Sequence, residues 1–432
     1  MKQKVDILWL VEHIAREMDV ACAVKALVEA RYGLDITIRN MYHQAYETMQ
    51  DYAPSVVVWP FFYFAKGALA VEDYVKTWPK ATHFNLSWEE LYYKALLKPK
   101  APSDGFAKKK VIHHAWGNFY KEYLLEFGVP EDHIFVNGQP AYQLYREPYN
   151  CYYKHRDWLA ERYGLDRLAR WIFIPENYRW AFGSKINLFT RLGGDRDEML
   201  GMQQFCIDSL KQILQWCNQV ARHKKVAVIF RPRPATNSQL IADFFAQNVG
   251  EQAPRLHFIK EETVREWILA SDLVISSFST SLIEAAVAGK PVFMVEPVSL
   301  PDALYSDWYR HIPRLCTLAE FEQACLQENT IGGGQDLKTW AESEMLSNGD
   351  PIDHLASFVN GLVETQRQAK TKRRSPLFFR RSELLQKNYF NLAAHEMDVF
   401  TEEDVQKRVA AWREVLLPCS SVAVDNPIAA TQ

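Results

Sequence analysis

The chain has 432 residues, of which 48% are hydrophobic and 13% aromatic, so it is a core-rich protein too long for one ordinary core. Its formal net charge of −3 gives no overall attraction to nucleic acid, which is therefore not an expected partner. Seven dispersed cysteines show neither zinc nor disulfide spacing, which favours reduced thiols and a cytoplasmic location. No apolar stretch is long enough to span a membrane, and the apolar N-terminus lacks a small-residue cleavage site.

Strands and helices alternate through the first 150 residues. The expected strands are residues 4–11, 35–39, 55–59, 82–86, 111–115 and 133–136, and the expected helices are 12–32, 68–77 and 119–127. This alternation predicts an open, mostly parallel sheet. We therefore expect a Rossmann-like domain at residues 1–150.

A second alternating series follows a Pro- and Tyr-rich junction near residues 146–168. Its expected strands are 171–174, 226–230, 256–259, 273–276 and 292–295, with helices at 200–222, 238–248, 264–270 and 282–288. The predicted fold class is α/β, with two Rossmann-like domains facing a cleft. The second domain spans 169–330, and a helical extension with a basic tail occupies 331–432.

Ligands of doubly wound sheets bind beyond the carboxyl ends of the strands, which directs attention to a few turns. The strand at 273–276 ends in five hydroxyl side chains within six residues: Ser276, Ser277, Ser279, Thr280 and Ser281. A helix start ringed by hydroxyls suits a phosphate. Ser281 and Glu284 have the spacing of a capping box, so these two residues are expected either to start the helix or to contact a ligand.

The strand at 226–230 ends in Arg231-Pro232-Arg233-Pro234. Two guanidinium groups at a strand end can hold a phosphate or a carboxylate, or can pair with acidic side chains. The sequence contains no glycine-rich dinucleotide fingerprint and no P-loop. Together with the hydroxyl-rich turn, the arginine pair predicts an anion site on the second domain.

Glu176 and Asn177 follow the strand at 171–174. A carboxylate in that place could act as a nucleophile or a general base, or could simply anchor a turn. Asn177 is expected to face the cleft. No His, Cys, Asp or Glu set has metal-ligand spacing, so neither a metal nor a tightly bound cofactor is expected.

The first domain supplies further polar residues at its strand ends. Glu12 and His13 follow the first strand, and His113 and His114 end the strand at 111–115, just before Trp116-Gly117-Asn118. Glu12 and His114 are candidates for acid/base catalysis, and His13, His113 and Asn118 for acceptor or cleft contacts. One of the two adjacent histidines is expected to be a core residue, and the other could reach the cleft as an acid/base or phosphate contact.

Residues 366–381 contain seven basic side chains and no acidic one. Such a run is either a solvated face or a contact with an anionic membrane surface. The second alternative would place the protein at the inner face of a membrane.

The segment SSFSTSLIEAAVAGKPVFMVEP resembles the donor-site turn and helix of GT-B glycosyltransferases and of the related nucleotide-sugar 2-epimerases. The pairing of Arg-Pro-Arg-Pro with a Ser-Ser turn is similar to the His-Pro and Ser-Ser/Thr motifs of bacterial sialyltransferases, Kdo transferases and glycerophosphotransferases. Arg233 stands where their histidine would be. The chain also looks like bacterial surface carbohydrate biosynthesis proteins, through VIHHAWGNFY, IFVNGQPAYQLY, IPENYRWAF and IFRPRPATNS.

This resemblance implies a glycosyltransferase of surface polysaccharide or lipopolysaccharide synthesis. It favours a CMP-activated ulosonic acid, such as Kdo or a nonulosonate, as the donor and a glycan as the acceptor. Three alternatives stay open: a UDP-sugar transferase or epimerase, a CDP-glycerol-type glycerophosphotransferase, and a non-catalytic subunit of a polysaccharide assembly complex.

Overall fold

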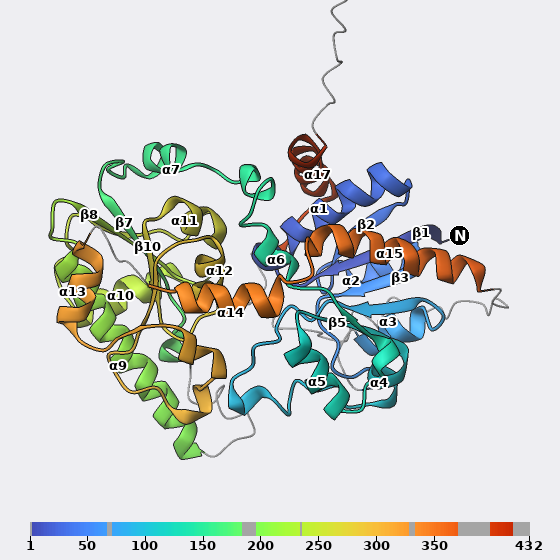
Figure 1. Cartoon of the computed structure of the whole chain (residues 1–432), viewed down its shortest axis with the longest axis horizontal. Coiled ribbons are helices and arrows are strands. Elements are labelled where there is room, and N and C mark those ends of the chain that lie inside the picture. Colours follow the sequence, from blue (N-terminus) through green and yellow to red (C-terminus); the bar gives the residue numbers. More distant parts are fainter. Residues whose placement is uncertain are drawn as a thin grey trace, which may run out of the picture.

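A computed structural model describes residues 2–66, 71–183, 196–233, 236–327, 333–369 and 398–417. The chain forms two α/β domains side by side (Figure 1), each built on one six-stranded sheet. Every strand pair in both sheets is parallel. The expected fold of two Rossmann-like domains is therefore confirmed.

The N-terminal sheet has the strand order β2-β1-β3-β4-β5-β6. Its strands are β1 (Gln3–Val11), β2 (Ile36–Asn40), β3 (Tyr52–Trp59), β4 (Thr82–Asn85), β5 (Val111–Ala115) and β6 (Ile134–Val136). Continuous apolar runs such as Ile7–Val11 are completely buried because helices cover both faces of a parallel sheet. The central strand β1 pairs Ile7 with Ile36 on one side and with Val56 on the other.

The C-terminal sheet has the order β12-β11-β10-β7-β8-β9. Its strands are β7 (Arg170–Pro175), β8 (Val226–Arg231), β9 (Leu256–Phe258), β10 (Leu273–Ser276), β11 (Val292–Val295) and β12 (Arg314–Leu315). Strand β12 was not expected from the sequence, since two residues give no readable pattern. The turns after β7, β8 and β10 lie at neighbouring positions because these three strands are adjacent in the sheet.

The helices of the first half are α1 (Ile14–Tyr32), α2 (Ala45–Asp51), α3 (Val71–Thr77), α4 (Gly105–Lys110), α5 (Asn118–Glu126), α6 (Pro140–Gln143) and α7 (Arg156–Tyr163). Those of the second half are α9 (Arg196–Val220), α10 (Ser238–Asn248), α11 (Val264–Ala270), α12 (Ser281–Val287), α13 (Leu318–Leu326), α14 (Gln335–Met345), α15 (Pro351–Gln368) and α17 (Glu402–Leu416). The 3-10 helices are η1 (Lys94–Leu96), η2 (Glu131–His133), η3 (Tyr149–Tyr152), η4 (Arg179–Phe182), η5 (Asp302–Leu304) and η6 (Asp307–His311).

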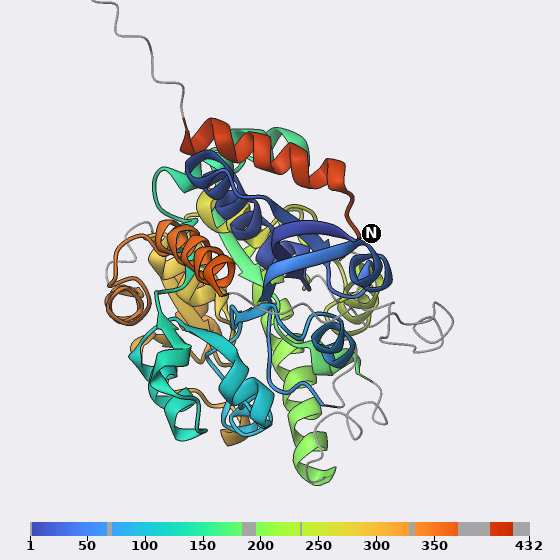
Figure 2. The same cartoon turned by 90° about the vertical axis from the view of Figure 1, so that its right-hand side faces the viewer.

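The last helices return to the N-terminal domain. In Figures 1 and 2, α15 and α17 lie against α1, and their buried side chains Val359, Val405 and Trp412 join the core formed by β1 and α1. The sequence predicted a helix at 352–368 but not which domain it would cover. Most of the basic run 366–381, from residue 370 onward, lies outside the described residues.

Helix α14 runs from the C-terminal domain to the N-terminal one (Figure 1) and its end docks on two glycines. A Cβ on Gly117 would stand 2.1 Å from the Glu344 carbonyl oxygen, and one on Gly138 would stand 2.7 Å from that of Met345. The Gln139 N–H donates to the Met345 carbonyl at 2.8 Å. The Trp-Gly-Asn and Asn-Gly-Gln-Pro motifs thus form a docking surface for the crossing chain.

Candidate functional site

The five hydroxyls after β10 divide into two groups. Ser276 is buried, and its Oγ donates to the Pro175 carbonyl at 2.6 Å, which joins β10 to the end of β7. Ser277 is also buried, beside the phenol of Tyr178. These two hydroxyls are therefore directed into the domain.

The other three hydroxyls surround the start of α12. Ser279 Oγ lies 2.6 Å from Ser281 Oγ and accepts from the Ser281 N–H at 3.3 Å. Thr280 is exposed and occupies the N-cap position without a side-chain cap bond. Of these three residues, Ser279 and Thr280 are accessible, whereas Ser281 is buried.

The capping box expected at Ser281 and Glu284 does not form. Ser281 is already inside the helix, and Glu284 accepts instead from the Tyr145 hydroxyl at 2.5 Å. Burial raises the pKa of Glu284, against the opposing effect of Arg265. Tyr145 follows α6, so Glu284 ties α12 to the chain that connects the two domains.

The arginine turn after β8 is held by Glu176. The Arg233 N–H and the Thr236 hydroxyl both donate to Glu176 Oε2 at 3.2 Å, and the Tyr178 N–H donates to Oε1. Burial raises the pKa of this carboxyl, although the nearby Arg233 opposes the shift. The contacts of Glu176 are those of a residue that shapes the turn.

Arg231 and Arg233 differ in their surroundings. Arg231 is 7% exposed, and its Nη2 donates to the Glu262 carbonyl at 2.8 Å. Burial lowers the pKa of Arg231 to about 10. Arg233 is more accessible than Arg231 and is the better placed of the two to meet an anion.

Asn177 links three turns. Its side-chain amide donates to the Phe278 carbonyl at 3.2 Å, and the same carbonyl accepts from the Tyr93 hydroxyl at 3.3 Å. Tyr93 belongs to the N-terminal domain. The hydroxyl-rich turn is therefore anchored from both domains.

His113 and His114 are core residues. His113 contacts the Ala107 carbonyl through Nε2 at 2.8 Å, and His114 contacts the Leu86 carbonyl through Nδ1 at 3.0 Å. Burial lowers the pKa of each to about 4, so both rings stay neutral near pH 7. Both side chains are completely buried, and neither reaches the surface of the domain.

His13, and not His114, has the surroundings that suit an acid/base residue. Its ring is 39% exposed, and its Nδ1 lies 2.8 Å from Asp398 Oδ2. Asp398 also accepts from the Ile14 N–H at 2.9 Å and so completes the start of α1. Although burial favours the neutral ring, the hydrogen bond to Asp398 raises the pKa of His13. No local signal predicts this pair, because 385 residues separate its members.

Glu12 belongs to a charged network around Arg16. Arg16 donates to Glu12 at 2.7 Å, to Glu17 at 2.6 Å and to Glu89 at 2.9 Å. Burial raises the pKa of Glu17 to about 7. Burial also opposes ionisation of Glu89, but Lys100 and Arg16 outweigh it and lower its pKa to about 2. The four-residue spacing of Glu12 and Arg16 is a readable signal for this pairing, although we did not predict it from the sequence.

The starts of α1 and α12 both border α11. Arg265 of α11 donates to the Ala15 carbonyl at 3.1 Å and to the Arg16 carbonyl at 3.0 Å, and its charge acts on Glu284. Arg265 thus connects the start of α1 in the N-terminal domain with the surroundings of Glu284 in the C-terminal one. Asn118 is exposed at the first position of α5.

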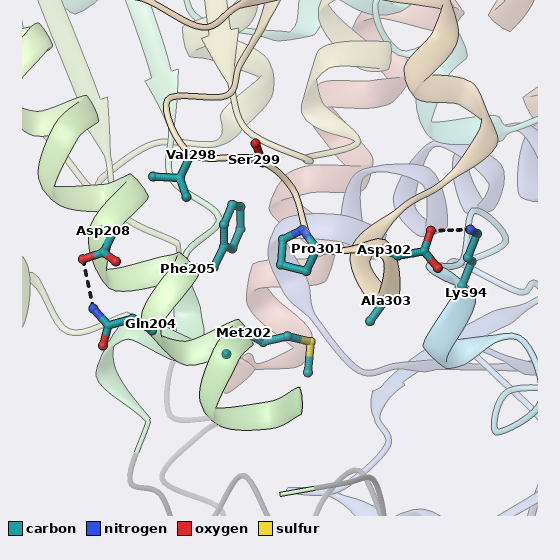
Figure 3. Close-up of a pocket in the computed structure, with 11 residues that line it drawn as sticks. Lys94, Met202, Gln204, Phe205, Asp208, Val298, Ser299, Pro301, Asp302 and Ala303 are labelled. Carbon is teal, nitrogen blue, oxygen red and sulfur yellow. Dashed lines mark hydrogen bonds and ion pairs between the residues drawn. The ribbon is translucent and has the colours of Figure 1, made fainter. Parts of the chain in front are cut away.

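A cavity of about 790 Å³ lies between the domains at the end of β11 (Figure 3). Phe205 and Met202 of α9 face Pro301 and Ala303 across it, and Lys94 pairs with Asp302 at 2.5 Å on its far side. None of the predicted site residues lines this cavity.

Within the described residues, no three His, Cys, Asp or Glu side chains come close enough to hold a metal ion. Among the same residues, no helix is long and apolar enough to cross a membrane.

No protein-family model matches this sequence, and no curated protein matches it significantly. Solved structures match it in fold. MnaA from S. aureus, solved with UDP, aligns with a TM-score of 0.53 at 12% identity, over 88% of this chain and 100% of its own. The UDP-GlcNAc 2-epimerase from Neisseria meningitidis, bound to UDP-GlcNAc, aligns with a TM-score of 0.50 at 12% identity, over 84% and 100%. The wall teichoic acid polymerase TagF, soaked with CDPG, aligns with a TM-score of 0.53 at 11% identity, over 84% and 90%. The chain therefore has the GT-B-like fold of these nucleotide-sugar and CDPG-binding proteins.

Proposed function

We propose that this protein is a nucleotide-sugar-dependent glycosyltransferase of surface-glycan synthesis, in which His13 deprotonates the acceptor hydroxyl. The observation that carries the proposal is the His13–Asp398 pair. A carboxylate can only accept, so Nδ1 donates to Asp398 and the basic lone pair resides on Nε2. A partly exposed imidazole held in one tautomer suits proton transfer from a sugar hydroxyl.

The reaction needs no covalent intermediate in this scheme. The acceptor oxygen attacks the anomeric carbon of the donor, the bond from that carbon to the phosphate oxygen breaks, and the nucleotide leaves with the electron pair. The acceptor proton passes to His13. This path inverts the configuration of the donor and uses Glu176 as the residue that shapes the arginine turn, not as a nucleophile.

The donor phosphate would bind between Arg233 and the hydroxyls of Ser279, Thr280 and Ser281. Arg233 follows β8 and the three hydroxyls follow β10, and β7 lies between these two strands in the same sheet. A guanidinium and several hydroxyls can together neutralise and hydrogen-bond a phosphate without a metal ion. Arg231 would support the turn through its bond to the Glu262 carbonyl.

The nucleotide itself is best identified by calorimetric titration with CMP, CDP, UDP and GDP. The resemblance of the sequence favours CMP, whereas the solved neighbours were studied with UDP, UDP-GlcNAc or CDPG. We expect one of the four to bind, and Arg233→Ala to weaken that binding by about tenfold or more. Arg255→Ala is the matched control, because Arg255 precedes β9 at the opposite end of the same sheet. Absence of binding by all four nucleotides would contradict the proposal.

A second candidate function is a nucleotide-sugar epimerase or a glycerophosphotransferase, and the fold shared with such proteins is the observation in its favour. Incubation of the bound donor alone separates these functions. Isomerised donor identifies an epimerase, whereas transfer only after addition of a glycan identifies a glycosyltransferase. Nucleotide-free binding of glycan would instead support a non-catalytic subunit.

A further inference from the structure

A second cavity, of about 470 Å³, lies between the domains and is bordered by residues of α5 and α14. Its volume is within the range of about 300–1,000 Å³ that is common for small-molecule sites. The N-terminal domain contributes the segment 90–97 and Phe119, and the C-terminal half contributes η6 and α14. None of the residues discussed for the nucleotide lines it.

Aromatic side chains make up much of the cavity wall. They are Tyr92, Phe119, Tyr305, Trp308 and Trp340. Trp340 stacks on His311, with ring centroids 5.3 Å apart and an interplanar angle of 14°. Aromatic walls of this kind accept the C–H face of a sugar ring, because the ring face carries partial negative charge and C–H groups carry partial positive charge.

Glu90 supplies a buried polar group to the same cavity. It is 4% exposed, and its Oε2 accepts from the Trp116 N–H at 2.8 Å. Its Oε1 has no hydrogen-bond partner among the described residues. Burial raises the pKa of Glu90 well above its ordinary value and so favours the protonated carboxyl. A neutral carboxyl both donates and accepts, as a sugar hydroxyl does.

The charges around the cavity do not favour an anion. Lys94 is paired with Asp302, Arg310 donates to His311 Nε2 at 3.1 Å, and Asp307 lies in the same wall. Glu344 adds a further acid to the wall. An aromatic wall, a buried carboxyl and charges of both signs together match an uncharged polyhydroxylated ring.

We propose that this cavity binds a neutral pyranose unit of a glycan, with Glu90 hydrogen-bonded to a ring hydroxyl and the aromatic side chains packed against the ring. The site would hold the acceptor glycan at a unit other than the one that carries the reacting hydroxyl. This inference rests on the proposed function, because only a glycosyltransferase has an acceptor glycan. Because both domains line the site, a bound glycan would also bridge them.

The test is saturation-transfer-difference NMR with the methyl glycosides of glucose, galactose, mannose and N-acetylglucosamine at millimolar concentration. We expect at least one of them to bind. Glu90→Gln should retain binding, because an amide also donates and accepts, whereas Glu90→Leu should weaken it by about tenfold or more.

Trp340→Leu serves as a second variant in case Glu90→Leu fails to fold, and it should also weaken binding about tenfold. Trp158→Leu is the matched control, since Trp158 is an exposed residue of α7 outside the cavity. Failure of all four glycosides to bind, or binding that ignores both Glu90→Leu and Trp340→Leu, would overturn the inference. Nucleotide titration of the same samples distinguishes the two proposals. If nucleotide binds but no glycoside does, only the proposed glycan site is contradicted, and the proposed function is not.

Discussion

At the scale of single residues, the site depends on which polar groups are already committed to internal partners. Ser276, His113 and His114 have internal hydrogen bonds and are buried. His13 is oriented by Asp398, lies 3.8 Å from Glu12 through Nε2 and keeps a partly exposed ring. That contrast moves the catalytic assignment from His114 to His13.

Replacement of His13 by Asn should lower kcat by about 10²-fold or more, because a general base typically contributes that much. Asp398→Asn should have a smaller effect and should move the rising limb of the pH–kcat profile to lower pH, because it removes the negative charge that, through its hydrogen bond, raises the pKa of His13. Steady-state rates across neutral pH measure both effects. His155→Asn, a change of an exposed histidine at the start of α7, is the control.

The same pair predicts a pH dependence of stability. The folded-state pKa of His13 is raised, so the protonated His13–Asp398 pair stabilises the fold fully below the ordinary His pKa. This contribution is lost as pH rises through the folded-state pKa. Denaturant titrations of the wild type and of Asp398→Asn at several pH values should show that difference, and identical pH slopes would contradict it.

Glu176 gives a prediction that separates two roles. As the acceptor for Arg233 and Thr236, it should hold the arginine turn in place. Glu176→Gln should therefore weaken nucleotide binding and lower the free energy of unfolding by about 1–3 kcal/mol. A variant with unchanged nucleotide affinity and no turnover would instead support the role of nucleophile that its position after a buried strand allows.

At the scale of elements, α14 and its two glycine contacts connect the domains. Gly138 has a φ of +111° and lies against both Met345 and Pro351, so the position excludes a side chain for two independent reasons. The chain from α14 into α15 is thereby fixed against β6.

Gly138→Ala should destabilise the protein by about 2 kcal/mol or more, from backbone strain and from the clash with the Met345 carbonyl. Gly33→Ala is the matched control: Gly33 also has a positive φ, of +62°, but no atom lies within 4 Å of the place that a Cβ would occupy there. The Gly33→Ala variant should lose only the part of the unfolding free energy that corresponds to backbone strain. Equal thermal shifts for the two variants would show that α14 does not dock closely on Gly138.

At the scale of the whole molecule, one buried carboxylate joins three separate parts. Asp19 of α1 accepts from Arg265 of α11 at 3.1 Å, from Arg408 of α17 at 3.1 Å and from the Tyr153 hydroxyl at 3.0 Å. Asp19 and Arg265 are almost completely buried. Asp19 therefore connects the N-terminal domain with both the C-terminal domain and the last helix.

Arg265→Met should cost about 3 kcal/mol of unfolding free energy, because it leaves part of the charge on Asp19 uncompensated. Calorimetry should show a lower Tm and weaker coupling between the unfolding of the two domains. Arg255→Met removes the exposed pair with Asp166 and should change Tm much less. Indistinguishable melting curves for the two variants would contradict the coupling.

The sequence by itself determined the alternating strands and helices, and hence the turns that could carry chemistry. Apolar runs such as 7–11 and 273–275 are strands because they are buried on both faces of a parallel sheet, and that pattern is local. The order of β7, β8 and β10 then brings the turns with Glu176, Arg233 and Ser279 together, as expected from their strand ends.

Only the tertiary structure decided which of these residues are accessible and what they contact. Glu284 bonds to Tyr145 and not to its own helix start, and His13 pairs with a carboxylate 385 residues away. Helix α15 covers the N-terminal domain although it follows the C-terminal one. Burial and long-range hydrogen bonds are properties of packing between distant segments, so a local pattern cannot contain them.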